Sequence, residues 1–319
     1  MLFKSISPFL INSGKKSRVQ SILNVLCFHR VLGEADLFRP QCPNVTQFRQ
    51  KLRVYKQFAE FLPLKEAVEA VLIHKRPGLF AAVTFDDGYK DNVSVALPIL
   101  TAEGIRPTFF IASGFVGGEM MFNDLIDESI RTTNSPTLRL EEFFKYPLDL
   151  GGFPQKIQAA ETVNQTIKYL SPDKRDLVAK HVAKLLGYTK NADLILSRRE
   201  LADASTKACD LGGHTHRHLI ASTVSNELFS SDVKINRDLL EEITQRPVSM
   251  FAYPNGKASR DFNLGHERIV EESGYTYAFS TEQRLIFSND SPFALPRFSP
   301  WSENKWMILR QVIQGIRNV

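Results

Sequence analysis

Cysteine is scarce in this sequence, and long hydrophobic runs are missing from it. The 319 residues include three cysteines, Cys27, Cys42 and Cys209, an odd number without Cys-x-x-Cys spacing. Such a set suits neither a disulfide framework nor a zinc site built from thiolates, and it favours a reducing compartment. No stretch has the length and apolar character of a transmembrane helix.

A large excess of charge of one sign is missing as well. The 40 Lys and Arg residues exceed the 35 Asp and Glu residues by five, and no basic run is interleaved with aromatic residues. We therefore expect no nucleic-acid partner, whereas a mildly basic chain is compatible with an anionic glycan or a lipid surface. The hydrophobic share of 43% is ordinary for a globular protein, of one large domain or two small ones.

Residues 1–22 form a basic arm that precedes the rest of the chain, residues 23–319. The apolar part of the arm is short and broken by Pro8, and no small-x-small cleavage site follows before Lys15. We therefore expect a cytoplasmic protein rather than an exported one. Two interpretations of the arm stay open: a frayed terminus, or a peripheral contact with a membrane surface. The oligomeric state is not indicated.

Apolar runs and amphipathic patterns alternate along most of the chain. Helices are indicated between the runs, among them 44–60, 64–72 and 264–273. Short apolar runs predict buried strands at 22–28, 80–85, 108–111, 209–213, 248–253, 275–280 and 293–298. Alternation implies parallel strands, and about seven of them suit a closed or nearly closed α/β barrel better than two domains.

A polar, helical insert of about residues 123–200 interrupts this alternation. Its best-marked helix begins at Ser171 and Pro172, and another helix begins with a capping box at 197–200. The inner stripe expected for the first of these helices is Val178, Val182 and Leu185. After the insert, a helix is expected to use one face made of Leu228, Ile235, Leu239 and Ile243.

Two adjacent carboxylates, Asp86 and Asp87, stand at the end of the strand 80–85, directly before Gly88. Their charges would repel each other unless their roles differ. A bound metal separates the roles, because one carboxylate ligates the ion and the other stays free to move protons. In a barrel of parallel strands the chemistry gathers at the carboxyl ends of the strands, which is where these acids fall.

The segment Gly212–His218 holds three histidines where another strand should end. His214 and His218 are four residues apart, so on a helical turn both imidazoles would face the same way. In an extended segment His216 would share that face, and it stays an alternative ligand. One carboxylate with two imidazoles leaves a coordination position open for water, which is typical of a catalytic zinc site.

The segment Phe251–Gly256 is a third candidate. It either closes a strand in a Pro-Asn-Gly turn or presents backbone N–H groups of residues such as Tyr253 and Asn255 to an oxyanion beside the metal.

Together, the segments 84–88, 214–218 and 251–256 resemble the three motifs of the carbohydrate esterase family 4, or NodB-homology, polysaccharide deacetylases. The resemblance runs from about Leu26 to Pro300. The segment 25–30 is similar to the strand that opens the branch containing poly-N-acetylglucosamine deacetylases. The family fold is a distorted (β/α)7 barrel, which agrees with the alternation described above.

The resemblance implies a hydrolase that removes N-acetyl groups from a sugar or polysaccharide of the cell envelope or an exopolysaccharide. Asp86 would be the general base, and Asp87, His214 and His218 would bind a divalent metal, usually Zn²⁺, with Co²⁺ or Ni²⁺ able to serve. Thr215 would brace the histidine loop. The alternatives are a catalytically degenerate glycan-binding module and an amidase acting on a non-sugar amide.

The chain departs from the family pattern in three places. Ala252 stands where the third motif usually has an arginine, and a late Asp-x-x-Asp-Trp motif is not recognisable. The late Leu-x-His motif, which usually holds the catalytic acid, has no histidine in the corresponding segment 294–298. We therefore expect His29 to supply the proton, and Arg297 is a candidate for the missing arginine. Asn123 and Asp124 either cap a helix, which we favour, or line the substrate groove.

Overall fold

The computed structural model describes residues 20–190 and 192–300, together with residues 304, 306–308, 310 and 312. Most of the expected N-terminal arm, residues 1–19, lies outside the described residues. Within the described parts, no helix is long and apolar enough to cross a membrane.

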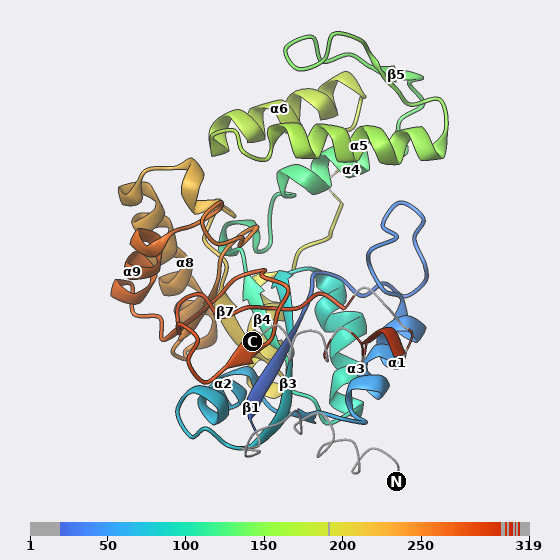
Figure 1. Cartoon of the computed structure of the whole chain (residues 1–319). Coiled ribbons are helices and arrows are strands. Elements are labelled where there is room, and N and C mark those ends of the chain that lie inside the picture. The colour runs from blue at the N-terminus through green and yellow to red at the C-terminus, as the bar shows by residue number, and fades with distance from the viewer. Residues whose placement is uncertain are drawn as a thin grey trace.

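A curled, mostly parallel sheet forms the centre of the protein (Figure 1). Its edge strand β10 runs antiparallel to β1, and the short β2 pairs with β3. The order across the sheet is β10 (Ile286–Phe287), β1 (Ser21–Phe28), β3 (Gly78–Asp87), β4 (Thr108–Ile111), β7 (Asp210–Gly213), β8 (Met250–Ala252) and β9 (Tyr277–Phe279), with β2 at Glu60–Phe61. Six of the seven predicted strands are therefore found: 108–111 with the predicted ends, and the others shortened or lengthened at their ends.

The seventh predicted strand, near 293–298, forms isolated bridges with β9 and β1. The amide of Ser280 donates to the carbonyl of Leu295, and the amide of Phe298 donates to the carbonyl of Val25. The segment therefore lies between β9 and β1, where it completes the curl of the sheet. This arrangement confirms the predicted distorted (β/α)7 barrel.

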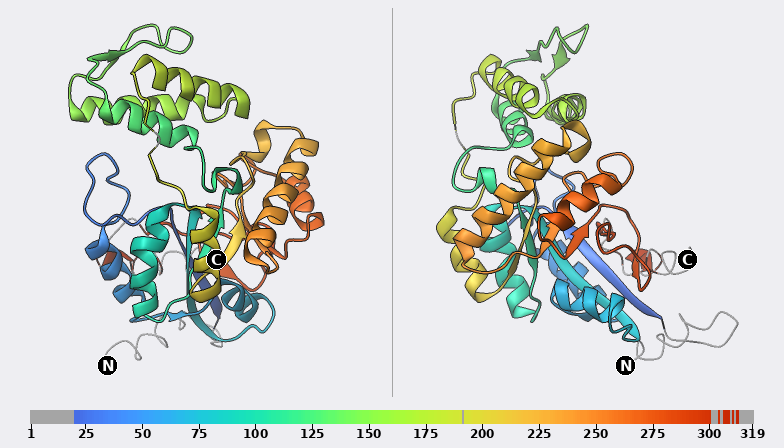
Figure 2. Two further views of the ribbon diagram at one scale, coloured as in Figure 1. Left: turned by 180° about the vertical axis from the view of Figure 1, so that it is seen from behind. Right: turned by 90° about the vertical axis from the view of Figure 1, so that its left-hand side faces the viewer.

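Helices cover the outside of the sheet (Figures 1 and 2). They are α1 (Val45–Tyr55), α2 (Leu64–Leu72), α3 (Leu97–Ala102), α7 (Arg198–Lys207), α8 (Asn226–Thr244) and α9 (Leu264–Glu272). Short turns lie at η1 (Asn92–Ala96), η2 (Ser113–Phe115) and η3 (Ala221–Thr223). Capping boxes at Asn44 and Ser197 start α1 and α7, as the hydrogen-bonding capacity of these side chains favours.

The buried face of α8 is not the predicted one. Leu228 and Ile235 are 43% and 47% exposed, while the polar residues Asp232 and Asn236 are buried. The apolar residues of the buried face are Phe229, Val233 and Leu240, a stripe offset from the predicted one. The helix is turned this way because it also points polar groups towards a loop that needs hydrogen-bond partners.

The helical insert is a separate layer beyond the carboxyl ends of the strands (Figures 1 and 2). It consists of α4 (Phe122–Thr132), α5 (Phe153–Ile167), α6 (Pro172–Leu185) and a small hairpin of β5 (Thr137–Leu138) and β6 (Leu148–Asp149). The three helices enclose a hydrophobic core of their own. Val178 and Val182 belong to that core as predicted, whereas Leu185 is 49% exposed.

Candidate metal centre and active site

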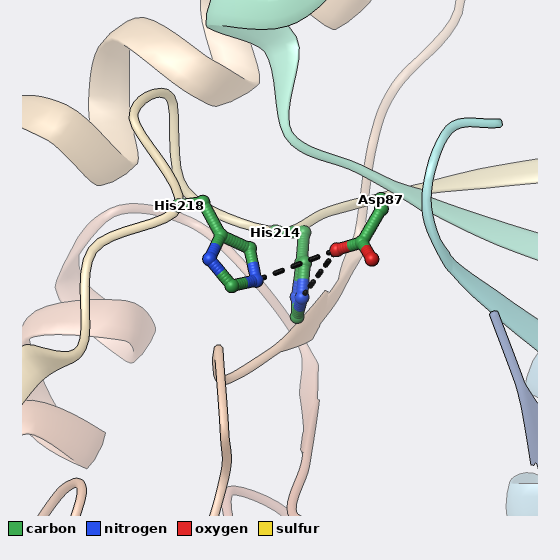
Figure 3. Close-up of side chains that lie close together, drawn as sticks. All are labelled: Asp87, His214 and His218. Atoms are coloured by element: carbon green, nitrogen blue, oxygen red, sulfur yellow. Dashed lines mark ion pairs between the residues drawn. The ribbon is translucent and has the colours of Figure 1, made fainter. Parts of the chain in front are cut away.

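Asp87, His214 and His218 meet at the carboxyl ends of β3 and β7. Oδ1 of Asp87 lies 3.5 Å from Nε2 of His214 and 3.3 Å from Nε2 of His218. Figure 3 shows both imidazoles turned towards this carboxylate. One ligand atom from each residue lies within 4.8 Å of the others, as a shared metal ion requires.

The histidine loop is not the helical turn that the spacing of four suggested. Thr215 and His218 have φ angles of +59° and +50°, and Asp87 has +78°. Left-handed backbone at non-glycine residues costs of order 1–3 kcal/mol each and gathers at functional sites. Both rings reach the same carboxylate through this bent loop instead of a shared helix face.

The donor atoms suit a divalent metal. Oδ1 of Asp87 is buried and makes no hydrogen bond of good geometry, although it faces the two imidazoles. Burial by itself raises the pKa of Asp87, but the nearby imidazoles outweigh it, and the carboxyl stays ionised. Burial lowers the pKa of His214 to about 4, so its ring is neutral at pH 7. An ionised carboxylate with neutral imidazoles is the donor set of open zinc sites.

The two imidazoles are anchored differently. Nδ1 of His214 donates to the carbonyl of Ala252 at 2.8 Å, which turns Nε2 towards Asp87. Nδ1 of His218 is buried and has no hydrogen-bond partner. His216 lies outside the cluster, because its Nδ1 is 3.0 Å from the hydroxyl of Ser113. The alternative in which His216 is a ligand is therefore wrong for this arrangement.

Asp86 forms a buried pair with Arg297. The guanidinium donates to both carboxylate oxygens, at 2.6 and 2.7 Å, and Arg297 is fully buried. Burial alone would raise the pKa of Asp86, but the charge of Arg297 outweighs it and keeps the pKa below its usual value. Arg297 thus supplies the cationic partner of Asp86. Ala252, in β8, stands at the position where the third motif usually has that arginine. The thiol of Cys27 lies 3.7 Å from Oδ2 of Asp86.

A cavity of about 490 Å³ adjoins Asp87, a size typical of small-molecule sites. Its walls are the end of β1, the segment 39–43 and helix α4. The exposed side chain of His29 lines it. The position is compatible with the expected proton donor.

Asp124 also lines this cavity, so the helix-cap interpretation is wrong. The first turn of α4 has Met121 at its cap position without a side-chain hydrogen bond. Asp124 is 2% exposed and accepts from the hydroxyl of Tyr89 at 3.0 and 3.2 Å, while Asn123 lines the same cavity. Burial raises the pKa of Asp124 to about 7.

The third motif contributes less than its sequence suggested. The ring of Tyr253 stacks on Phe262, its hydroxyl donates to the carbonyl of Phe293, and its amide donates within the sheet. Tyr253 is therefore a packing residue, and the expectation that it contacts substrate is wrong. Asn255 has a φ of +59°, and its Nδ2 is buried without a partner.

Helix α8 supports the histidine loop in a way that we did not predict. Nδ2 of Asn236 lies 2.8 Å from the carbonyl of Thr215, and Asp232 accepts from the amides of His216 and Arg217. The hydroxyl of Thr215 accepts from the amide of Leu219 at 2.8 Å. The sequence signal that could have revealed this support is the pair Asp232 and Asn236, two polar residues four apart within an amphipathic helix.

A family model described as polysaccharide deacetylase matches residues 74–142 and 155–278, more than half of the chain. No curated protein sequence matches. Among solved structures, IcaB from Ammonifex degensii is similar over 92% of this chain and 97% of its own, with a TM-score of 0.60 and 19% identity. The deacetylase PplD from Streptococcus pyogenes, in complex with acetate, is similar over 92% and 99%, with a TM-score of 0.60 and 15% identity. A de-N-acetylase from Aggregatibacter actinomycetemcomitans is similar over 91% and 99%, with a TM-score of 0.55 and 12% identity.

Proposed function

The chain belongs to the polysaccharide deacetylase family, and from this premise we propose that it removes N-acetyl groups from an N-acetylated glycan with the help of a divalent metal. One observation carries the proposal: the cluster of Asp87, His214 and His218 lies beside a second carboxylate, Asp86, which is paired with Arg297. The two carboxylates therefore have different surroundings, as a ligand and a base should have.

Asp87, His214 and His218 would hold the metal. When bound, a divalent ion lowers the pKa of a water molecule from 15.7 towards ~7 and polarises a carbonyl oxygen. The protein's own part is to keep Asp87 ionised and His214 neutral: the nearby histidines keep Asp87 ionised against the effect of burial, and burial keeps His214 neutral. The identity of the metal is left to experiment among Zn²⁺, Co²⁺ and Ni²⁺.

Asp86 accepts the proton of the attacking water in this proposal. Arg297 occupies one side of both carboxylate oxygens and keeps the group charged and fixed in direction. Two groups complete the proposal. His29, on the cavity wall, gives a proton to the departing amine, and the resemblance to the family suggests that a backbone N–H near Asn255 stabilises the developing oxyanion. Acetate and a free amino sugar result.

Arg297 also bears on the alternative of a degenerate binding module. That alternative drew on the missing arginine at Ala252, and the structure supplies a guanidinium to Asp86 from another segment. The expected cytoplasmic location stays a prediction, and it would make a precursor sugar the substrate.

The test is acetate release from N-acetylglucosamine oligomers by protein stripped of metal and reloaded with Zn²⁺, Co²⁺ or Ni²⁺. We expect release only after reloading, and an Asp87→Ala variant should lose both metal and activity. Asp193→Asn, whose side chain is 81% exposed, is the matched control and should behave as wild type. Normal metal content in Asp87→Ala would refute the ligand assignment. Glycan binding without acetate release would favour the binding module, and release from simple acetanilides alone would favour a non-sugar amidase.

A further inference from the structure

The helical insert contacts the metal loop through one buried arginine, Arg175, in the first turn of α6. Arg175 is 2% exposed. Its Nη1 donates to the carbonyl of His218 and its Nη2 to the carbonyl of Arg217, both at 3.2 Å. The fork of the guanidinium therefore spans two consecutive carbonyls, one of which belongs to a candidate metal ligand.

The contact is reinforced from both sides. The side chain of Arg217 reaches back to Asp173 at 2.6 Å and to Asp176 at 3.6 Å on the same helix. The guanidinium of Arg175 lies 4.4 Å from the ring centroid of Phe122 in α4. Helices α4 and α6 of the insert thus hold Arg175 in place. Hydrogen bonds run in both directions between α6 and the loop, because Arg175 donates to loop carbonyls and Arg217 of the loop donates to Asp173 of α6.

His218 depends on its backbone more than His214 does. His214 is oriented by its ring, because Nδ1 donates to Ala252, whereas Nδ1 of His218 has no partner. Second-shell partners normally fix the orientation of metal-binding imidazoles. The left-handed backbone of His218 adds a local cost that its surroundings must offset.

The hydrogen bonds from helix α8 to the histidine loop do not reach the carbonyl of His218. Asn236 holds the carbonyl of Thr215, and Asp232 holds the amides of His216 and Arg217. The carbonyl of His218 is held by Arg175, from the insert.

We propose that Arg175 is a positioning residue for His218, so that the helical insert completes the metal site. The proposal rests on the proposed function in assuming that the cluster binds a metal. It assigns the insert a task in the metal site itself, in addition to forming one wall of the cavity. Arg175 contacts no reacting atom and acts through the backbone of the ligand.

Three variants separate this role from general packing. Arg175→Met removes the fork but keeps an unbranched apolar stem, and Arg175→Lys keeps the charge but not the geometry that spans two carbonyls. Lys174→Met is the matched control, because Lys174 is the neighbouring residue, is 49% exposed and pairs with Glu142 on the surface.

The first measurement is hydrogen exchange of the metal-free proteins over residues 214–219. We expect exchange in this segment to quicken by roughly tenfold in Arg175→Met, while the strands of the barrel keep wild-type rates, because only local opening is affected. The second measurement is Zn²⁺ affinity by competition with a chromophoric chelator. Loss of an outer-shell partner typically weakens metal binding by about 10- to 100-fold, which we expect for Arg175→Met, with a smaller loss for Arg175→Lys.

Wild-type exchange and Zn²⁺ affinity in Arg175→Met would overturn the proposal, as would an equal loss in Lys174→Met. Should Arg175→Met fail to fold by circular dichroism, Arg175→Lys carries the same two measurements, and wild-type values there would overturn it. A wild-type protein that binds none of Zn²⁺, Co²⁺ and Ni²⁺ would refute the proposed function, while the exchange measurement would still decide whether Arg175 orders the loop.

Discussion

Replacing Arg297 with methionine would test the pairing that keeps Asp86 charged. Arg297 is fully buried and makes two short hydrogen bonds to Asp86, with further ones to the carbonyl of Ser280 and the hydroxyl of Thr84. Methionine fills much of the space of the stem and removes every donor. The change leaves Asp86, which is 2% exposed, without its cation.

Removing one partner of a buried ion pair costs about 3–5 kcal/mol, because the remaining charge stays desolvated. A domain has about 5–15 kcal/mol of stability in total, so Arg297→Met should fold but unfold at clearly lower urea concentration. Without the charge and hydrogen bonds of Arg297, burial raises the pKa of Asp86, and a larger fraction of the base is protonated. We expect kcat to fall by about 10²–10⁴, the usual contribution of general base catalysis.

The free energy of unfolding should depend on pH in opposite directions in the two proteins, because the pKa of Asp86 is shifted in opposite directions. In the wild type the pKa of Asp86 is lowered, so its contribution to stability is complete above the unfolded value of 3.8 and is lost as pH falls through the folded pKa. In Arg297→Met the pKa is raised, and stability is lost as pH rises instead. The difference in unfolding free energy between the two proteins should therefore be larger at pH 8 than at pH 5.

Urea unfolding of metal-free protein at these two pH values measures the difference, and Asp86→Asn/Arg297→Met is the control, because it removes the stranded charge. We expect the double variant to be more stable than Arg297→Met at pH 8. A single variant within about 1 kcal/mol of wild type at both pH values, below the range for a broken buried pair, would refute the argument.

Three further predictions concern the cavity, the proton donor and the strand beside the loop. Burial raises the pKa of Asp124 from 3.8 to about 7, so the folded protein loses stability as pH rises between these values. In metal-free protein, Asp124→Asn should therefore gain up to roughly 3 kcal/mol over wild type between pH 5 and pH 8, and an equal difference at both would contradict it. His29→Gln should lower kcat about 10²–10⁴-fold with unchanged Zn²⁺ affinity, and a normal kcat would exclude His29 as proton donor. A Cβ on Gly213 would lie 2.2 Å from Oη of Tyr275 and 2.4 Å from Oδ1 of Asn236. Gly213→Ala should therefore lower the free energy of unfolding by about 1–3 kcal/mol in urea, and wild-type stability would show that the helix α8 contact yields easily.

The barrel was predictable because its strands are short apolar runs with clear ends. The run 80–85 lies within β3, and 108–111 coincides with β4. Hydropathy alone did not decide between two apolar stripes of α8, and the buried one, with Phe229, Val233 and Leu240, also carries Asp232 and Asn236. These polar residues gain partners only after the histidine loop has folded over them. A pattern of apolar residues carries no information about such partners.

The meeting of the candidate metal ligands was predictable from topology. Asp87 ends one strand and His214 follows another, and the carboxyl ends of parallel strands meet at one rim. The path of the loop was not, because a spacing of four fits a helical turn as well as the left-handed bend at His218. Arg175 lies 43 residues before His218, in a helix whose docking depends on tertiary packing alone.

The cationic partner of Asp86, Arg297, lies outside the local sequence motifs of the site. It is 211 residues from Asp86 in sequence and reaches it because residues 294–298 lie between β9 and β1. A carboxylate as buried as Asp86 would be protonated without a cation, so a working base requires some guanidinium or ammonium group nearby. The requirement concerns charge and distance, and it does not specify the strand that provides the cation. Ala252 at the usual position therefore argues for a displaced partner rather than for a lost base.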